Sequence, residues 1–418
     1  MASKNPQGIQ PFAEFVASLE SAKHEHFASR AAVKVANEDA FAGMRKHLIH
    51  FYTGVEAQNS FIDENGSIFD CIPTEQQPSL KGKSETVPKA PDLPRSEEKS
   101  GSRDKRQTAL VQSLLHPARK DPHGNAMHCP EGTIPMRRIT LENLARFETL
   151  QQFFKKSPVG SGHPNAASPA VAATHKYAHA YQFVKNWGGH SFLNLWDPSI
   201  GADQIFSLSQ HWYVGGSGAA LQTAEVGWQV YPQMYNNTKP VFFIYWTADA
   251  YQHTGCYNLT CTAFVQTSSS WTIGGAINPP WSTSGGAQYE LQVAYFLSGG
   301  KWWLYINGTS GSNAIGYYPV SLYNGGAMAT GASEIDYGGE VVGTTSWPPM
   351  GSGAFANAGY GKACYQRQIQ YYPVGGGIVD ASLTGSQPSP KCYTVEVHKF
   401  NPPWSETIFF GGPGGTGC

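Results

Sequence analysis

The sequence of 418 residues lacks long apolar runs, an excess of charge of either sign and an apolar leader at its start. No stretch approaches the roughly 20 apolar residues that a helix needs to span a bilayer. The 29 basic and 30 acidic residues leave a net charge of -1, without a basic run or an RNA-binding motif. The first residues, MASKNPQGIQPFAEF, are not a signal peptide, because no basic end precedes an apolar core. These absences argue against a membrane or a nucleic-acid partner.

The second part of the chain is also short of charge. From residue 175 onward it holds all 11 Trp and 36 of the 46 Gly, but only 8 Lys or Arg and 11 Asp or Glu. Short aromatic and β-branched runs such as KPVFFIYWTA and KWWLYI alternate with Gly, Pro and Asn turns. This pattern predicts an all-β domain over 175–418, folded as an antiparallel two-sheet sandwich. Since the domain has few surface carboxylates that change charge in acid, little of its stability depends on their ionisation, which suits work at low pH.

Residues 1–155 have a more ordinary composition and predict a smaller α+β domain. Apolar residues recur at helical spacing from Phe12 to Leu19, a second amphipathic run covers about 30–52, and LENLARFETLQQFFKK predicts a further helix. Residues 81–108 are charged and interrupted by Pro, which is typical of a flexible insert. Residues 156–174 are rich in Ser, Gly, Pro and Ala and have little to bury, so we expect an accessible linker there.

The seven cysteines fit disulfide bonds better than a metal site. No Cys-x-x-Cys pair or Cys/His set has zinc spacing, and we expect neither a metal nor a cofactor. Cys256 and Cys261 flank a short loop, and Cys392 and Cys418 bracket the C-terminal segment, so we expect the disulfides Cys256–Cys261 and Cys392–Cys418. Cys71 and Cys129, in the first half, could form a third disulfide. Cys364 is left over. Paired cysteines indicate an oxidising compartment, so we expect a secreted protein whose signal peptide has been removed.

Common hydrolase motifs are absent, and carboxylates remain as the candidate catalytic groups. The sequence has no Gly-x-Ser-x-Gly, His-Glu-x-x-His or Asp-Thr/Ser-Gly motif. Glu225 is unusual because it lies in TAEVGWQVYP, which otherwise suits a half-buried strand. In a regular strand Glu225, Gly227, Gln229 and Tyr231 share one face, and Gly227 leaves room beside the carboxylate. The alternative is an acid on the wet side of the strand.

Glu340 is the natural partner for such an acid. It lies in DYGGEVV, where glycines that permit close approach precede an apolar strand. Two carboxylates in one cleft of low dielectric titrate apart, so that one becomes a base and the other a proton donor. A competing cluster is Glu334, Asp336 and Glu340, similar to the Glu-x-Asp-x-Glu motif of β-sandwich glycosidases. Its last spacing is longer, and we expect the two glycines to kink the strand.

Several segments in the same order resemble the neprosin family of secreted glutamic peptidases. They are CPEGTIPMRR (129–138), QHWYVGG, AEVGWQVYP, YWTADAYQHTGCYNLTC, FVQTSSS, YGGEVV and MGSGAF. DCIPTEQQPSL (70–80) and CPEGTIPMRR resemble the activation domain of that family, and residues from about 175 resemble its peptidase domain. The resemblance implies a β-sandwich peptidase made as a zymogen, active in acid, independent of metal and cofactor, and cleaving after proline. It maps the two catalytic glutamates onto Glu225 and Glu340.

The chemistry that follows uses the two glutamates in different ways. One ionised Glu takes a proton from the attacking water, and the other, protonated, stabilises the oxyanion and then helps to protonate the leaving amine. Which glutamate has which part stays open. Gln229 and Tyr231 are candidate oxyanion or substrate partners from their strand parity, and we expect Gly227 to leave room for the substrate. Trp228 is a candidate for stacking on a proline ring, with core packing as the alternative.

The layout also predicts how the enzyme is kept inactive. We expect residues 1 to about 174 to cover the cleft, as an intramolecular inhibitor, until acid weakens the contact. The linker contains Pro158, Pro164 and Pro169, so a proline-directed enzyme could cut its own tether. The expected partners are proline-containing polypeptides and this inhibitory domain. Two other functions stay open: a β-sandwich glycoside hydrolase that uses Glu334 and Glu340, and a non-catalytic binding module of the same fold.

Overall fold

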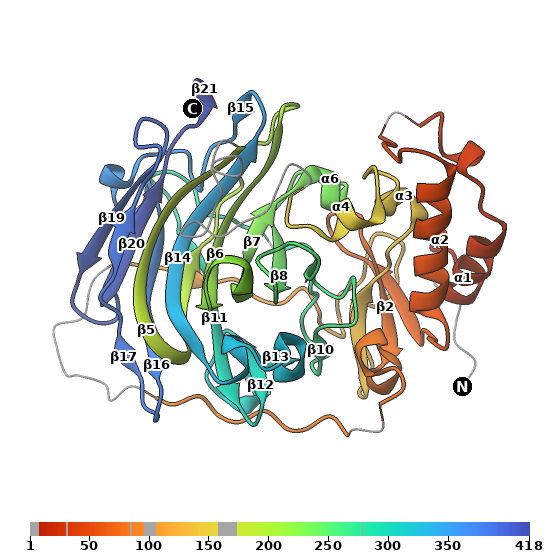
Figure 1. Ribbon diagram of the computed structural model, residues 1–418, viewed down its shortest axis with the longest axis horizontal. Helices are drawn as coiled ribbons and strands as arrows, with labels where there is room; N and C mark the ends of the chain where they lie inside the picture. Colours follow the sequence, from red (N-terminus) through yellow and green to blue (C-terminus); the bar gives the residue numbers. More distant parts are fainter. Residues whose placement is uncertain (1–7, 31, 84–85, 96–105, 158–173, 278) are drawn as a thin grey trace.

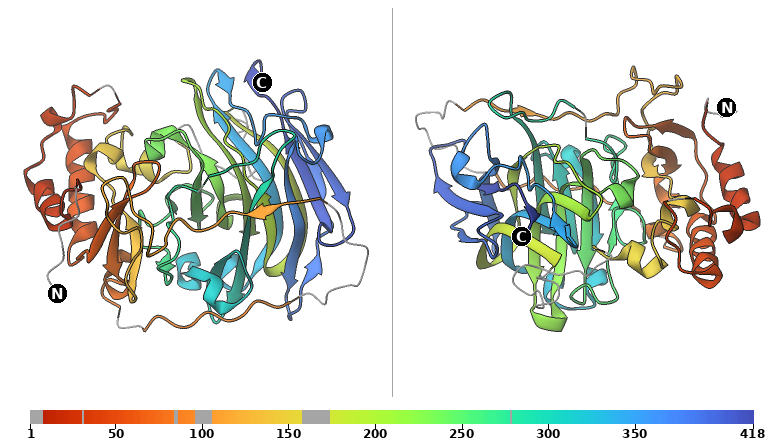
Figure 2. Two further views of the ribbon diagram at one scale, coloured as in Figure 1. Left: turned by 180° about the vertical axis from the view of Figure 1, so that it is seen from behind. Right: turned by 90° about the horizontal axis from the view of Figure 1, so that it is seen from above.

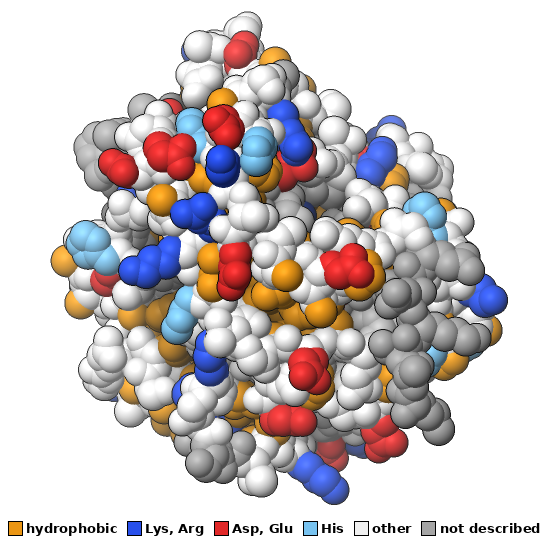
Figure 3. Space-filling view, turned by 90° about the vertical axis from the view of Figure 1, so that its right-hand side faces the viewer, with side chains coloured by type: hydrophobic (Ala, Val, Ile, Leu, Met, Phe, Trp, Pro, Cys, Tyr) orange, Lys and Arg blue, Asp and Glu red, His pale blue; other side chains and the backbone are white. Residues whose placement is uncertain are grey.

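The computed structural model describes residues 8–30, 32–83, 86–95, 106–157, 174–277 and 279–418. A smaller N-terminal domain, which carries the longer helices, lies beside a large β domain (Figure 1). Acidic and basic side chains are interspersed over the outer face of the N-terminal domain (Figure 3). Within the described residues, no helix is long and apolar enough to cross a membrane.

The N-terminal domain has the predicted α+β composition. Helices α1 (Phe12–Ser21) and α2 (Glu38–Tyr52) share an apolar core with a three-stranded antiparallel sheet of order β1-β2-β4. The strands are β1 (Asn59–Ile62), β2 (Ile68–Pro73) and β4 (Thr133–Arg137). Helix α2 begins eight residues later than the predicted run, because the Asn37 side chain caps it by accepting a hydrogen bond from the Ala40 amide.

The predicted single helix over LENLARFETLQQFFKK is wrong. It is divided into α3 (Leu141–Leu144) and α4 (Leu150–Phe154), and Thr140 and Thr149 cap the two pieces. Between them Arg146 donates hydrogen bonds to Gln233 O at 2.9 Å and Asn236 Oδ1 at 2.6 Å in the β domain. These contacts between domains, together with the two caps, outweigh the intrinsic helix propensity of the segment.

The β domain is a large, curled, mainly antiparallel sheet, as predicted for an all-β sandwich (Figure 1). The 20-residue strand β5 (His175–Asn194) joins its parts, because it pairs with β14, β11, β16 and β18 along its length. The strands from β6 to β13 are β6 (Gln204–Gly215), β7 (Gln222–Val230), β8 (Val241–Thr247), β9 (Cys256–Tyr257), β10 (Val265–Gln266), β11 (Tyr289–Ser298), β12 (Lys301–Ile306) and β13 (Ala314–Pro319). The later ones are β14 (Ala332–Gly343), β15 (Ser346–Trp347), β16 (Cys364–Pro373), β17 (Val379–Asp380), β18 (Thr384–Ser386), β19 (Thr394–Lys399), β20 (Glu406–Gly411) and β21 (Gly415–Thr416).

Short helices complete the two domains. The β domain holds the α-helical turn α6 (Pro232–Tyr235). The 3-10 helices are η1 (His24–His26), η2 (Thr74–Gln76), η3 (Pro78–Leu80), η4 (Gly218–Ala220), η5 (Gly311–Asn313), η6 (Val320–Tyr323), η7 (Ala327–Ala329) and η8 (Ala356–Ala358).

The described parts of the predicted flexible insert lie along the β domain (Figure 2). Leu93 is buried in an apolar cluster with Trp303 and other β-domain residues. The guanidinium of Arg106 lies 4.1 Å from the ring centroid of Phe400. Directly after the insert, β3 (Ala109–Leu110) pairs in parallel with β11. The charged composition of the insert predicted a flexible segment. In the described parts, the apolar contact of Leu93 and the cation–π contact of Arg106 instead attach the insert to the β domain.

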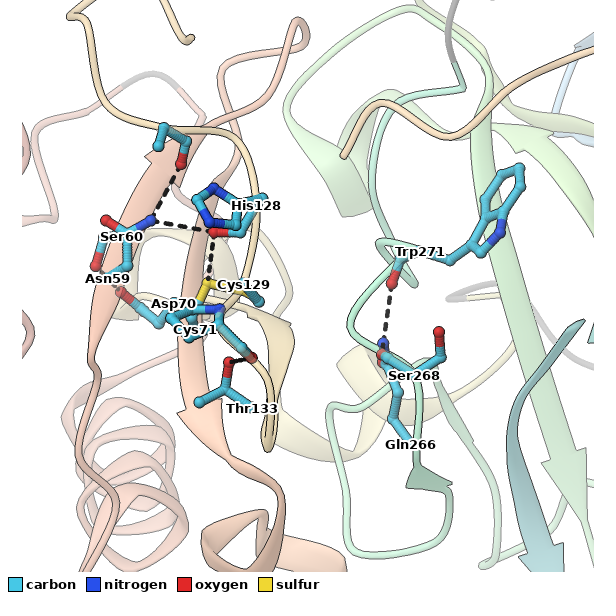
Figure 4. The surroundings of a disulfide bond; sticks show 12 residues. Asn59, Ser60, Asp70, Cys71, His128, Cys129, Thr133, Gln266, Ser268 and Trp271 are labelled. Atoms are coloured by element: carbon cyan, nitrogen blue, oxygen red, sulfur yellow. Dashed lines mark hydrogen bonds between the residues drawn. A yellow bond between two sulfur atoms is a disulfide. The ribbon is translucent and has the colours of Figure 1, made fainter. Parts of the chain in front are cut away.

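All three expected disulfides form, and Cys364 is free and buried. The Cys71–Cys129 bond joins β2 to the loop before β4 (Figure 4). Beside it the Asn59 side chain donates to the backbone oxygens of Ala126 and His128, which fixes the same loop. The bonds confirm the pairing that we predicted from the sequence.

Candidate active site

Strand register brings Glu225 and Glu340 to one face of the sheet. Strands β7 and β14 both pair with β6, where Trp212 lies opposite Glu225 and Leu208 lies opposite Glu340. Trp212 and Leu208 are four residues apart, so their side chains lie on the same face. Both glutamates are fully buried. Glu225 and Glu340 therefore share one face of the sheet, and the alternative of a solvent-facing Glu225 is wrong.

Lys156, which follows the N-terminal domain as the first residue of the predicted linker, lies between the two carboxylates. The Nζ atom of Lys156 is 2.7 Å from Oε2 of Glu225 and 2.8 Å from Oε2 of Glu340, and all three side chains are fully buried. Burial alone would lower the pKa of Lys156, but the two glutamates outweigh it and raise that pKa. Burial would raise the pKa of Glu340, but Lys156 and then His175 outweigh it and lower that pKa. The site is thus two carboxylates joined by one ammonium.

The backbone around Lys156 is bound as well. Tyr245 of β8 donates its hydroxyl to Phe154 O at 3.1 Å, and Tyr257 of β9 donates to Lys156 O at 2.7 Å. Tyr245 lies opposite both Glu225 and Tyr257 in the sheet. Burial raises the pKa of both tyrosines well above the usual value, so both remain donors. The segment that follows α4 is therefore held in the site by its main chain and by its lysine.

Neutral donors surround Glu225. Gln210 Nε2 donates to its Oε2 at 2.9 Å, while Thr223 Oγ1 and Tyr251 OH donate to its Oε1 at 2.8 and 2.7 Å. Tyr251 lies in a turn where Ala250 and Tyr251 both have positive φ, of 55° and 64°. Such a backbone is costly for residues with side chains and is retained where the surroundings enforce it, often at functional sites.

A histidine contacts Glu340. His175 Nδ1 lies 2.6 Å from Oε1 of Glu340, and both side chains are fully buried. His175 is the first residue of β5 and follows the linker directly. The sequence analysis missed both His175 and Lys156, because their side chains reach Glu340 only through contacts between distant parts of the chain. A charged residue at the edge of a segment that otherwise has nothing to bury was the one available signal for Lys156.

The other residues on the predicted face have mixed outcomes. Gln229 and Tyr231 are fully buried, but Gln229 Nε2 donates to Tyr235 OH at 2.7 Å and Tyr231 packs against Phe206. Trp228 Nε1 donates to Asn194 O on the opposite face, which favours its core alternative. We expected Gly227 to leave room for substrate. Instead, a Cβ at this position would lie 2.0 Å from Ser209 O, so the glycine admits the backbone of β6.

The competing glycosidase cluster is not assembled. Strand β14 runs unbroken through Gly338 and Gly339, so the predicted kink is wrong. Glu334 and Glu340 are six residues apart on that strand, or about 20 Å. Glycosidase carboxylates lie about 5–9.5 Å apart. Both oxygens of Asp336 lie within 2.9 Å of His179 Nδ1, which gives this acid a separate partner.

The proposed cleavage positions Pro158, Pro164 and Pro169 lie outside the described residues. The described chain leaves the site after Lys156 and Ser157 and returns to it with Thr174 and His175. Both ends of the linker therefore meet at Glu340, through Lys156 on one oxygen and His175 on the other.

Comparison with known families agrees with this organisation. A family model described as Neprosin matches residues 203–413, and one described as Neprosin activation peptide matches residues 60–182. Together with the fold, these matches define the class of protein as the zymogen of a peptidase. The chain belongs to the neprosin family, whose members are secreted peptidases.

Solved structures of glutamic peptidases are similar at a low level. Scytalido-glutamic peptidase with a peptide-based transition-state analog has 6% sequence identity and a TM-score of 0.29, and the match covers 58% of this chain and 98% of that chain. The same enzyme with a transition-state analog inhibitor has 8% identity and a TM-score of 0.31 at the same coverage. SCP-B, a member of the Eqolisin family of peptidases in complex with the tripeptide Ala-Ile-His, has 7% identity and a TM-score of 0.27, again with 58% and 98% covered.

Proposed function

We propose that this chain is the precursor of a secreted, acid-active glutamic endopeptidase that cleaves after proline with Glu225 and Glu340. The observation that carries the proposal is the position of Lys156, whose ammonium lies within 2.8 Å of both buried carboxylates. One cation of this size reaches two acids only when they face a single small site. A pair of acids that shares a site is the arrangement in which one serves as base and the other as proton donor.

The reaction can take place only after Lys156 has left the space between the two carboxylates. One ionised glutamate takes a proton from water as the water oxygen bonds to the scissile carbonyl carbon. The protonated glutamate donates a hydrogen bond to the carbonyl oxygen as negative charge develops there. The carbon–nitrogen bond then breaks, the amine leaves with a proton from a glutamate, and the pair is ready for another water. Because the two acids interact strongly, the pair as a unit has the apparent pKa values that control activity.

Lys156 accounts for inhibition in the precursor and for activation in acid. Its ammonium occupies the space between the carboxylates, and Tyr257 holds its backbone oxygen. The pKa of Glu340 is lowered, so the ion pair stabilises the precursor above the ordinary pKa of Glu and is lost as the pH falls through the lowered value. Acid therefore weakens the ion pair of Lys156 with the glutamates, and cleavage near Pro158, Pro164 or Pro169 makes the dissociation of the lysine irreversible.

The test compares variants after identical processing. The linker between residues 158 and 173 is replaced by the recognition sequence of an unrelated peptidase, so that inactive variants are also cut. Fluorogenic peptides with and without proline are then assayed from pH 2 to 8, a range that includes carboxylate titration. We expect cleavage after proline in acid, and loss of about 10²–10⁴-fold in kcat/KM for Glu225→Gln and for Glu340→Gln. Glu396→Gln, at an exposed glutamate, is the matched control.

Retention of activity by either active-site variant would rule out the proposed pair. Absence of cleavage by the processed wild-type protein at every pH would favour a binding module with this fold. N-terminal sequencing after acid incubation of the unaltered chain tests self-processing, and a start that does not follow proline would exclude it.

A further inference from the structure

We propose that His175 is a positioning residue that keeps Glu340 ionised and oriented in acid, so that Glu340 is the base of the pair. The inference rests on the proposed function and assigns roles that the two glutamates alone leave open. His175 Nδ1 lies 2.6 Å from Oε1 of Glu340, and both side chains are fully buried. An ionised carboxylate accepts hydrogen bonds, so the Nδ1–H group donates to it.

The two oxygens of Glu340 have different partners. His175 contacts Oε1, whereas Lys156 contacts Oε2, the oxygen that the lysine joins to Glu225. When Lys156 leaves with the N-terminal domain, Oε2 is released on the side of Glu225, where a water must sit to be activated by one acid beside the other. Oε1 keeps its histidine. The histidine therefore holds the carboxylate without occupying the oxygen that faces its catalytic partner.

The position of His175 in the chain ensures that it stays in the mature enzyme. Pro158, Pro164 and Pro169 all lie between Lys156 and His175. A cut after any of them separates the lysine from the β domain and leaves the histidine at the start of β5. The Trp347 indole donates to Thr174 O at 2.7 Å, which anchors the residue before His175 on the β domain. Activation thus removes the ammonium at Oε2 of Glu340 and keeps the histidine at Oε1.

Titratable groups approach the His175–Glu340 pair from several elements. They are Tyr177 of β5, Glu225 of β7, Tyr251 of the loop after β8, Tyr257 of β9, Asp336 of β14 and Lys156 after α4. Burial raises the pKa of the three tyrosines well above the usual value, so they are neutral in acid. Asp336 is paired with His179. Glu225 repels a second negative charge at Glu340, and the hydrogen bond from His175, which lowers the pKa of Glu340, opposes that repulsion.

The same strand supplies a matched control. His179 Nδ1 lies 2.8 Å from Asp336 Oδ1, and this pair is buried like the first one. It has the same chemistry on the same two strands, but its carboxylate is not one of the two that Lys156 joins. A change at His179 therefore reports the general effect of breaking a buried His–carboxylate pair. A change at His175 reports the additional effect on the base.

The experiment measures kcat/KM against pH for the linker-cut protein carrying His175→Asn or His179→Asn. The Asn amide retains a donor near the Nδ1 position but cannot become cationic. Without the cation the pKa of Glu340 rises, and we expect the acid limb of the His175→Asn profile to move up by about 1–3 pH units. The alkaline limb of the His175→Asn profile should coincide with that of the unchanged enzyme. Both limbs of the His179→Asn profile should also coincide with those of the unchanged enzyme.

Three results would overturn the inference: an unchanged acid limb in His175→Asn, a shift of the alkaline limb instead, or an equal shift in His179→Asn. If His175→Asn does not fold, as judged by near-UV circular dichroism, the histidine NMR signals of the processed wild-type protein decide. A cationic His175 at the pH of maximal activity supports the inference, and a neutral one contradicts it. Activity that survives Glu340→Gln would instead overturn the proposed function, so the two failures are distinguishable.

Discussion

Glu225 and Glu340 meet at the same lysine, yet their surroundings differ in kind. Glu225 receives hydrogen bonds from an amide, a threonine and a tyrosine, none of which becomes charged in acid. Glu340 contacts a histidine at the end of the linker. Two identical side chains on one face of a sheet can thus be prepared for different tasks by their neighbours. Hydrogen bonds from neutral donors also favour the ionised form of an acid, but the Thr223 and Tyr251 hydroxyls can turn and accept a hydrogen bond from its protonated form. A neighbouring cation favours the ionised form alone.

The two glutamates also differ in how much of their surroundings belongs to the β domain and how much depends on the precursor. The neutral donors to Glu225 come from β6, β7 and the turn after β8, and all of them remain after processing. Both glutamates lose Lys156 on activation, but Glu340 also keeps its contact with His175, the residue that follows the linker. We therefore expect changes near Glu225 to affect turnover, and changes near Glu340 to affect how stability and activity depend on pH.

Lys156→Met should have the largest effect on the precursor. Removing the only described ammonium between two buried carboxylates should cost about 3–5 kcal/mol of unfolding free energy at pH 7. The pKa of Glu340 is lowered in the precursor, so the contribution is present above the ordinary pKa of Glu and disappears as the pH falls below the lowered value. Urea unfolding at pH 7 and pH 3 measures both quantities.

The neighbouring Lys155→Met is the control for Lys156→Met, because Lys155 is partly exposed. It should leave the unfolding free energy nearly unchanged at both pH values. An equal loss in the two variants, or a loss at Lys156 that persists in acid, would contradict the ion-pair account.

Tyr251→Phe should have a smaller effect, confined to Glu225. It removes the 2.7 Å hydrogen bond to Oε1 while Thr223 still donates to that oxygen. With Glu340 as the ionised base, Glu225 is the protonated acid of the pair. A hydrogen bond to a neutral group contributes about 0.5–1.5 kcal/mol, so kcat/KM of the processed enzyme should fall by up to about tenfold. Tyr245→Phe is the control, since its hydroxyl binds Phe154 of the N-terminal domain. Equal losses in the two variants would contradict the specific role of Tyr251.

Thr223→Val should have the smallest effect. Valine keeps the shape of threonine and removes one donor at 2.8 Å, and Tyr251 remains bonded to the same oxygen. We expect a loss of about threefold in kcat/KM, with the acid limb of the pH profile in place. A displaced acid limb would show that the donors to Glu225, and not His175 alone, set the ionisation of the base.

The sequence predicted the fold and the two glutamates better than their surroundings. Strand parity in TAEVGWQVYP correctly placed Glu225 on a common face with Gln229, because side chains alternate regularly in a strand. The same reasoning failed for Gly227, whose neighbour is the backbone of β6. Lys156 and His175 were missed because their contacts with Glu340 span long stretches of chain, which no local pattern encodes. The broken helix at Arg146 has the same cause, a bond to another domain.

The most direct test of the central claim is a double-mutant cycle on the processed enzyme. It compares kcat/KM for Glu225→Gln, Glu340→Gln and the double variant at the pH of maximal activity. Residues that act as one catalytic unit are strongly non-additive, because losing either member disables the other. If Glu225 and Glu340 are one pair, kcat/KM of the double variant should be about equal to that of the less active single variant. Losses that multiply would contradict a shared site, and so would activity retained by either single variant.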